Sequence, residues 1–112
     1  MQLTVLPLLA ERMEGEFDVF EVLLKTLEKN NAKLENGDVL VISTKYISNS
    51  QGRIVDLEKI RASEEGLKVS KTYQLKSEIA EIVIRESDKI FGGIGGFVIT
   101  SSDNIMAPNA GI

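Results

Sequence analysis

Apolar residues recur at helical spacing near the start of the chain. Five of them fall on one helical face: Val19, Phe20, Leu23, Leu24 and Leu27. Asp18 and Glu21 stand at the beginning of this run with the spacing of a capping box. The pattern predicts a helix over residues 18–30 that ends at Asn30-Asn31, because asparagine tolerates the left-handed backbone of a helix end.

A second helical pattern lies in the carboxyl-terminal half. Ser77 is placed to cap a helix over residues 78–88. Three apolar residues form its expected inner face: Ile79, Ile82 and Val83. Glu81 and Arg85 are four residues apart, and we expect this pair on the outer face of the helix.

Glycines decide the interpretation of two other segments. Ser63 predicts the start of a short helix, which Gly66 weakens by about 1 kcal/mol. The run Gly92-Gly93-Ile94-Gly95-Gly96 has neither P-loop nor Rossmann spacing, and it precedes a strand pattern, whereas phosphate loops precede a helix. The run therefore predicts a flexible turn between a helix and a strand.

The strongest strand signal runs from Asp38 to Thr44. Its apolar residues are consecutive rather than alternating, which predicts a strand covered on both faces, and residues 45–50 are expected to continue it in extended form. Weaker β-type runs occupy residues 2–6 and 97–100, turn signals lie at residues 36–37 and 103–104, and a last apolar segment covers residues 105–107. Because strands and helices alternate, the predicted fold class is α/β (α+β): a single small domain with a mixed sheet and two to three helices.

Charge and composition exclude several classes of function. The net charge of −4 argues against binding to nucleic acid or to anionic membranes, which needs basic patches. No stretch approaches the ~20 apolar residues of a membrane span and the start lacks a signal-peptide pattern, so we expect a cytoplasmic location. The absence of histidine and cysteine excludes catalytic triads, thiol nucleophiles and the usual zinc sites, leaving Mg²⁺ or Mn²⁺ as the metals to expect.

One polar segment is placed to bind a ligand. It runs from Ser43 to Arg53, directly after the strongest strand pattern, and ligands of α/β folds gather at the carboxyl ends of strands. The hydroxyls of Ser43 and Thr44 suit a base, ribose or phosphate, while Lys45 or Arg53 suits phosphate charge. A solvated strand end followed by a polar turn explains the same residues without a ligand.

The acidic residues are expected to be solvated surface charges rather than metal ligands. They lie mostly at helix starts and on exposed faces: Glu11, Glu14, Glu16, Asp18, Glu64, Glu65, Glu86 and Asp88.

Four motifs together resemble one family. The longest of them is Asn36-Gly37-Asp38-Val39-Leu40-Val41-Ile42-Ser43-Thr44, followed by Ile47-Ser48 and Gly52-Arg53. It resembles the core sequence motif of the coenzyme F-420-0:L-glutamate ligases. Three further matches come in the family's order: Leu3-Thr4-Val5-Leu6-Pro7, Arg85-Glu86-Ser87 and Asn109-Ala110-Gly111-Ile112. The resemblance covers the whole chain and about the first half of a family member.

This resemblance implies an archaeal-type, GTP-dependent ligase. Such an enzyme activates the lactate-derived carboxylate of a deazaflavin precursor as an acyl phosphate, and the amine of L-glutamate then displaces phosphate. Mg²⁺ or Mn²⁺ steadies the phosphates, and family members resemble intertwined homodimers.

The resemblance also implies nucleotide contacts. Ser43 and Thr44 fall on the family's guanine-nucleotide contact pair, although their hydroxyls suit either purine base, and Glu11-Arg12-Met13 corresponds loosely to another nucleotide-contacting stretch. A family lysine falls on Asn49, which removes a positive charge that Lys45 or Arg53 would have to supply. No catalytic residue is assigned. The family's metal-binding aspartate would follow Ile112, so residues 1–112 are expected to be an amino-terminal domain that holds no metal ligand and is inactive alone.

Two other hypotheses remain open. One is a non-catalytic dimerisation or interaction module that shares the ligase fold. The other is a related amide ligase with a different pterin-like or deazaflavin acceptor.

Overall fold

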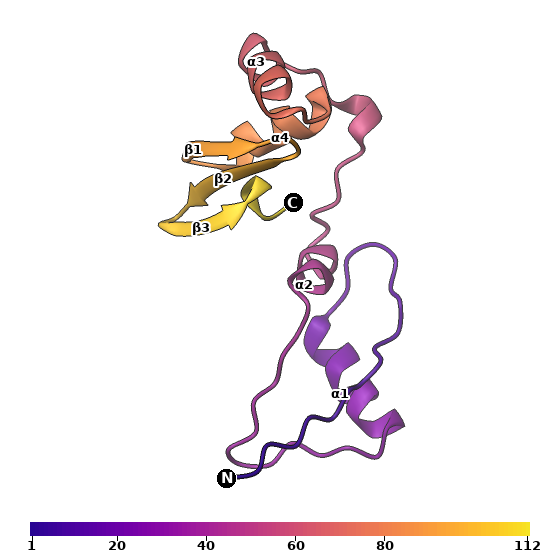
Figure 1. The fold of residues 1–112 in the computed structure, drawn as a ribbon. Helices are drawn as coiled ribbons and strands as arrows, with labels where there is room; N and C mark the ends of the chain where they lie inside the picture. Colours follow the sequence, from indigo (N-terminus) through magenta and orange to yellow (C-terminus); the bar gives the residue numbers. More distant parts are fainter. The chain divides into compact units, whose positions relative to one another are not determined.

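The computed structural model describes residues 1–112, which form two compact units, Met1–Val55 and Asp56–Ile112 (Figure 1). The mixed α/β class is confirmed, with four α-helices and one three-stranded sheet. The sheet is antiparallel throughout rather than mixed, because tight hairpins join its strands and such short connections fit only antiparallel neighbours. None of the helices is both long enough and apolar enough to cross a membrane.

Helix α1 (Val19–Lys29) of the first unit confirms the helix expected from the capping pattern. The Asp18 carboxylate accepts hydrogen bonds from the backbone N–H groups of Phe20 (2.8 Å) and Glu21 (3.1 Å), which satisfies two donors that the first turn leaves unpaired. After the helix, Asn31 adopts the expected left-handed backbone, with φ 49°. The buried residues are Val22, Thr26 and Leu27, so the packed face lies partly beside the predicted one.

The prediction of a strand over residues 38–44 is wrong. Residues 38–43 belong to no strand, and α2 (Thr44–Ser50) replaces the extended continuation expected over residues 45–50. The segment is not covered on both faces either, since Val39 is 86% and Val41 88% exposed. An apolar, β-branched run favours a strand only when another strand pairs with it, and no strand of the first unit does so.

The strand expected over residues 2–6 is also absent, for the same reason. This segment forms no ladder, and its apolar side chains are exposed, including Leu3, Val5 and Leu6. The turn expected at residues 36–37 is confirmed, with Gly37 at φ 97° and the Asp38 carboxylate accepting from Glu35 N–H (2.9 Å).

In the second unit, the short 3₁₀ helix η1 (Leu57–Lys59) precedes α3 (Glu64–Tyr73) and α4 (Ser77–Glu86). The Ser63 hydroxyl caps α3 by accepting from Gly66 N–H (3.1 Å), as its position predicts. Ser77 is the first residue of α4 rather than its cap, since the N-cap position belongs to Lys76.

Glu81 lies on the inner face of α4, contrary to the prediction that it faces solvent. Its side chain is 8% exposed and accepts hydrogen bonds from the backbone N–H (2.8 Å) and hydroxyl (2.7 Å) of Ser63. Arg85 completes the arrangement by donating to the other carboxylate oxygen at 2.9 Å. One carboxylate therefore joins the start of α3 to the middle of α4.

The Glu81 carboxylate predicts a loss of stability in acid. Hydrogen bonds from Ser63 lower the pKa of Glu81, and the Arg85 guanidinium acts in the same direction. A carboxyl group with a lowered folded pKa stabilises the fold at pH values above its unfolded pKa of about 4.3, and this contribution disappears as the pH falls through the folded pKa. Thermal melts followed by circular dichroism between neutral pH and acid should show a smaller loss of Tm for Glu81→Gln than for the wild type. Equal losses in both proteins would contradict this role.

The sheet contains β1 (Lys89–Ile94), β2 (Phe97–Ser102) and β3 (Ile105–Pro108), in that order. The glycine run thus belongs largely to a strand, and only Gly95-Gly96 makes the turn of the first hairpin. The second turn is Asp103-Asn104, where φ values of 48° and 63° match the two-residue turn that asparagine and aspartate favour.

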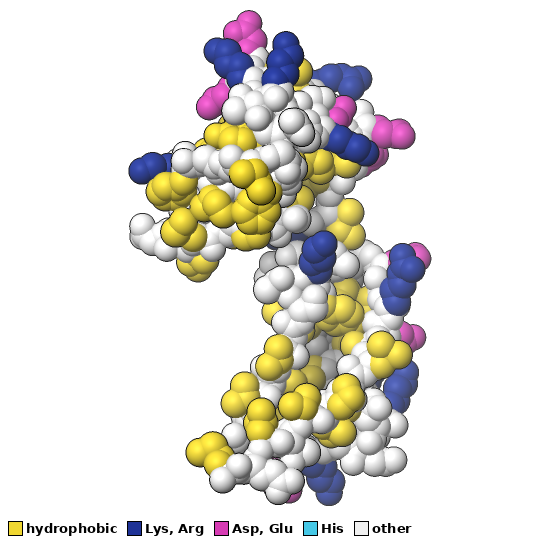
Figure 2. Space-filling view, in the orientation of Figure 1, with side chains coloured by type: hydrophobic (Ala, Val, Ile, Leu, Met, Phe, Trp, Pro, Cys, Tyr) yellow, Lys and Arg dark blue, Asp and Glu magenta, His cyan; other side chains and the backbone are white.

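The core of the second unit lies between α4 and one face of β2. Alternation along β2 directs Val98 and Thr100 inward, and both are fully buried, as are Ala80 and Val83 of α4. At the end of β3 the 3₁₀ turn η2 (Asn109–Gly111) contacts β2, β3 and α4. Figure 2 shows apolar side chains exposed over the sheet. The exposed large apolar residues of its strands are Phe91, Ile94, Phe97, Ile105 and Met106.

Candidate functional site

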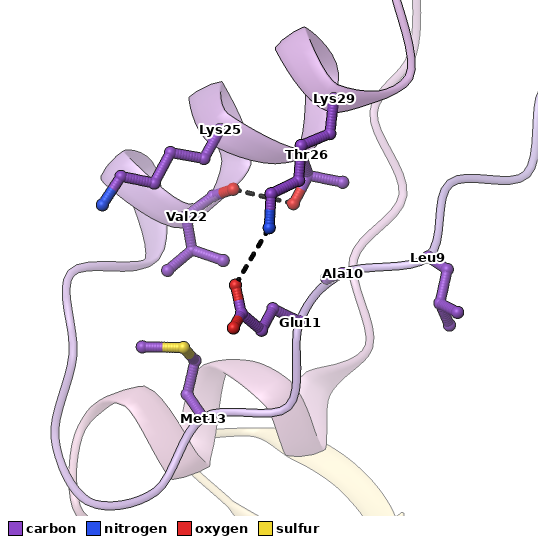
Figure 3. Close-up of a pocket in the computed structure, with 8 residues that line it drawn as sticks. All are labelled: Leu9, Ala10, Glu11, Met13, Val22, Lys25, Thr26 and Lys29. Carbon is purple, nitrogen blue, oxygen red and sulfur yellow. Dashed lines mark hydrogen bonds and ion pairs between the residues drawn. The ribbon is translucent and has the colours of Figure 1, made fainter.

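One hollow in the first unit lies between α1 and the segment that precedes it (Figure 3). Its volume is about 310 Å³, and it is lined by Leu9, Ala10, Glu11, Met13, Val22, Lys25, Thr26 and Lys29. The two lysines come from successive turns of α1, which places both ammonium groups along the same side of the helix.

Both lysines of this hollow are paired with carboxylates. Lys29 Nζ lies 3.2 Å from Glu11 Oε2, an ion pair that joins α1 to residues far away in sequence, and Figure 3 shows the two side chains pointing toward each other. Lys25 Nζ lies 2.6 Å from Glu21 Oε1, and the hydrogen bond that Lys25 donates to this carboxylate raises the pKa of Lys25. Both ion pairs are exposed, and exposed pairs are weak enough to be exchanged for a ligand anion.

A second hollow of about 250 Å³ adjoins the same loop. It is lined by Arg12, Met13, Glu14, Gly15, Phe17, Tyr46, Asn49 and Ile54. Tyr46 of α2 organises it, because its hydroxyl donates to the Glu11 carbonyl (2.7 Å) and its ring packs edge-on against Phe17, with ring centres 5.1 Å apart. A hydrogen bond from Phe17 N–H to the Ser50 carbonyl (3.1 Å) closes the loop onto α2.

A third hollow, of about 200 Å³, is mainly apolar and includes Ser43. Its wall is formed by Leu8, Ala10, Val19, Val22, Leu23, Thr26, Leu40, Val41, Ile42, Ser43 and Tyr46. Met13 lines the first two hollows, and Ala10 lines the first and the third. The segment around residues 9–14 is thus the shared wall of a polar and an apolar surface, an arrangement that suits a ligand with an aromatic and a charged part.

The structure brings together five of the residues selected from the sequence. Glu11, Arg12, Met13 and Asn49 line the first or second hollow, and Ser43 lines the third. All of them belong to the first unit.

The remaining selected residues are close in sequence to residues that line these hollows. Thr44 and Lys45 are exposed in the first turn of α2, directly after Ser43. Arg53 follows the turn that ends α2, and its backbone N–H donates to the Ser48 carbonyl at 2.9 Å. Because α2 replaces the predicted extended segment, Thr44 and Lys45 lie at the start of a short helix and Arg53 lies just after its end.

Sequence reasoning missed Lys25, Lys29 and Tyr46. Lys25 and Lys29 are four residues apart on a helix whose other face is apolar, so this spacing was a usable signal for two cations on one side. Tyr46 had no comparable signal, because its bond to Glu11 joins residues that are distant in sequence.

The carboxylates do not assemble a metal centre. No group of three acidic side chains converges anywhere in residues 1–112. Mg²⁺ often needs only one or two carboxylates together with substrate phosphates, so we assign no step of the chemistry below to a metal held by these residues alone.

Replacing Tyr46 by phenylalanine tests how the loop is held. Tyr46→Phe keeps the ring packing on Phe17 and removes the hydroxyl that bonds to the Glu11 carbonyl. We expect the free energy of unfolding of the first unit to fall by about 1 kcal/mol, measured by urea denaturation. Tyr73→Phe in the second unit is the matched control, because no hydrogen bond joins the Tyr73 hydroxyl to another residue. An equal effect of both substitutions would show that the Tyr46 bond contributes nothing.

Comparison with known proteins identifies a family. The model of the F420-0:gamma-glutamyl ligase family matches residues 8–112. This match includes both the hollows of the first unit and the sheet of the second.

Individual relatives agree with this match. A coenzyme F420:L-glutamate ligase of Methanothermobacter thermautotrophicus is 26% identical over 96 residues, covering 85% of this chain and 38% of the relative. Relatives of the same name from Archaeoglobus fulgidus and Methanopyrus kandleri are each 28% identical, and each match covers 80% of this chain and 36% of the relative. The chain thus spans less than two fifths of the length of these curated relatives. It belongs to the F420-0:gamma-glutamyl ligase family.

Proposed function

We propose that the protein carrying this chain ligates L-glutamate to a deazaflavin coenzyme F420 precursor in a GTP-dependent reaction. The observation that carries the proposal is the family match over residues 8–112, together with relatives that are named coenzyme F420:L-glutamate ligases. The cofactor, the nucleotide and the intermediate are the parts that experiment must test.

The proposed chemistry has two steps. An oxygen of the precursor carboxylate attacks the γ-phosphorus of GTP, the bond to the bridging oxygen of GDP breaks, and an acyl phosphate forms. The amine of L-glutamate then attacks the acyl carbon, inorganic phosphate leaves, and the nitrogen loses a proton to give the amide. Neither step needs histidine or cysteine, because positioning and neutralisation of phosphate charge supply most of the catalysis in phosphoryl transfer.

In this proposal the first unit contributes part of the nucleotide site. Arg12, Lys25 and Lys29 bring cations to the hollows on either side of residues 9–14, and cations are what phosphate oxygens require. The apolar hollow that includes Ser43 suits the base or ribose. Thr44, Lys45 and Arg53 are close in sequence to these walls and are proposed as further contacts.

The metal, Mg²⁺ or Mn²⁺, is proposed to be held at least partly by groups outside residues 1–112, as the family resemblance implies. We also propose a homodimer. Its support is the large apolar surface of the first unit, where Leu3, Val39 and Val41 are all more than four fifths exposed. Apolar surface of this extent is typical of regions that pack against another chain or another part of the same chain.

The test is glutamate incorporation by the complete gene product that contains this chain. The deazaflavin precursor, L-glutamate, GTP and Mn²⁺ are incubated with the protein, and mass spectrometry looks for a precursor that has gained one glutamyl residue. Replacing GTP by ATP measures nucleotide preference, and replacing the precursor by a pterin carboxylate measures acceptor preference. If none of these combinations yields an amide product, the proposal is rejected.

One observation favours a second candidate function, a non-catalytic interaction module. The residues around Val39 and Val41 are apolar and exposed and belong to no strand, so they are available to add to a sheet of a partner. A module of this kind would associate, by analytical ultracentrifugation, without binding GTP in calorimetry. Association together with metal-dependent GTP binding would favour the ligase instead.

A further inference from the structure

Tyr46 lines two of the hollows in the first unit. It belongs to the wall of the second hollow, together with Arg12 and Asn49, and to the wall of the third, together with Ser43. It is the only residue that these two walls share. A nucleotide has a similar division, because a flat base with apolar faces is joined through ribose to charged phosphates. Tyr46 therefore lies where the two parts of such a ligand would meet.

The third hollow suits a flat, uncharged group. No charged side chain lines it, most of its wall is aliphatic, and Tyr46 supplies the only aromatic ring. Its other polar side chains are Thr26, whose hydroxyl donates to the Val22 carbonyl (2.8 Å), and Ser43, whose hydroxyl makes no capping hydrogen bond in α2. Phosphate oxygens find no cation in this wall, whereas the faces of a base find apolar surface and an aromatic ring.

The ring of Tyr46 is held in place by the first unit itself. Its hydroxyl donates to the Glu11 carbonyl (2.7 Å), and the Phe17 ring packs edge-on against it, with the two planes at 64°. Tyr46 is nevertheless only half-buried, so part of its side chain remains accessible. A ring that is already fixed loses little further conformational freedom when a ligand binds, which favours affinity.

We propose that Tyr46 is a base-stacking residue of the nucleotide site. The base lies in the third hollow against the ring, and the phosphates extend past it toward Arg12 in the second hollow. This inference rests on the proposed function, because it takes the nucleotide of the ligase as the ligand of the first unit. Stacking of this kind accepts any purine, and it favours purines over the smaller pyrimidines because they cover more of the ring.

The test measures the nucleotide affinity of the complete gene product by isothermal calorimetry, with Mn²⁺ present throughout. Tyr46→Phe keeps the ring, whereas Tyr46→Leu replaces it by an aliphatic group. We expect Tyr46→Leu to weaken GTP binding by about tenfold or more, and Tyr46→Phe to stay within about twofold of the wild type, since base–aromatic stacking has effects of this size. The preference for GTP over CTP should shrink in Tyr46→Leu, because the purine loses the larger stacked area.

Inorganic triphosphate separates the loss of a base contact from general damage to the site. It carries phosphate charge without a base, so its affinity should be the same in the wild type and in Tyr46→Leu. Phe20→Leu is the matched control variant, because it also exchanges an aromatic residue of the first unit for leucine and lines none of the three hollows. All titrations are run well below the unfolding temperature of each variant.

A second measurement uses the wild type and does not depend on the folding of Tyr46→Leu. The tyrosine rings are labelled with heavy carbon for nuclear magnetic resonance, and the ring signal that is missing from Tyr46→Phe is assigned to Tyr46. A base stacked on this ring shifts its signal through the ring current of the base. GTP should therefore shift the Tyr46 signal, and inorganic triphosphate should not.

The outcomes separate the two proposals. A wild type that neither binds GTP nor forms the amide rejects the proposed function and this inference with it. In a wild type that does both, three results overturn the stacking role alone. These are GTP binding by Tyr46→Leu as tight as in the wild type, an equal loss of affinity for GTP and inorganic triphosphate, and a Tyr46 signal that GTP shifts no more than inorganic triphosphate does.

Discussion

Gly93→Ala should strongly destabilise the sheet of the second unit. A Cβ at this position would overlap the Phe97 carbonyl oxygen and lie 2.8 Å from Val98 Cα. Both are backbone atoms of β2, and the pairing of Gly93 with Val98 fixes their position. The strands must therefore separate to admit one methyl group. We expect a loss of about 3 kcal/mol, at the upper end for overpacking, and a fall in Tm of over ~10 °C.

Gly95→Ala is the control for Gly93→Ala, because it adds the same methyl group two residues away. Its Cβ would lie 2.8 Å from the side-chain oxygen of Gln74, an exposed and flexible group that can move aside. Thermal melts followed by circular dichroism should show a much smaller change for Gly95→Ala. Similar melting temperatures for the two variants would mean that the hairpin register of Gly93 and Val98 is wrong.

Asn49→Lys should strengthen GTP binding by about tenfold. Asn49 lines the same hollow as Arg12, and the family resemblance places a lysine at this position. An ammonium group about 4 Å from a phosphate interacts by about 4 kcal/mol at the effective dielectric of a protein surface. Desolvation and lost side-chain freedom offset much of this attraction, which leaves roughly 1.4 kcal/mol, or tenfold in Kd.

Isothermal calorimetry on the complete gene product measures this effect. Asn49→Gln is the matched control, because it lengthens the side chain without adding charge. The gain for Asn49→Lys should also shrink as salt is raised, since exposed charges are screened. Equal GTP affinities for the lysine and glutamine variants would remove Asn49 from the nucleotide site.

Local signals in the sequence predicted the elements that depend on local interactions. The cap at Asp18 and the spacing behind it fixed the position of α1, and Ser63 correctly marked the start of α3. The turn at Asp103-Asn104 was equally readable, because aspartate and asparagine adopt the left-handed backbone that this hairpin needs.

Elements that depend on distant partners were not predictable in the same way. The run from Val39 to Ile42 has strand composition, yet it has no neighbouring strand to pair with, forms no strand and stays largely exposed. The sequence pattern predicted Glu81 as half of a surface ion pair with Arg85. In the structure its side chain is buried and accepts a hydrogen bond from the backbone N–H of Ser63, which lies eighteen residues earlier.

The candidate site shows the same division. The sequence directed attention to residues 11–13 and to Asn49, which the structure places around shared hollows. Tyr46 and its bond to the Glu11 carbonyl became visible only in three dimensions.

The most direct test of the proposed ligase is the fate of the precursor's carboxylate oxygen. The precursor is labelled with heavy oxygen in that carboxylate and incubated with the complete gene product, L-glutamate, GTP and Mn²⁺. Activation as an acyl phosphate transfers one labelled oxygen to phosphorus, so the account predicts glutamyl product together with inorganic phosphate that carries a single heavy oxygen. Unlabelled phosphate, or no glutamyl product, would contradict it.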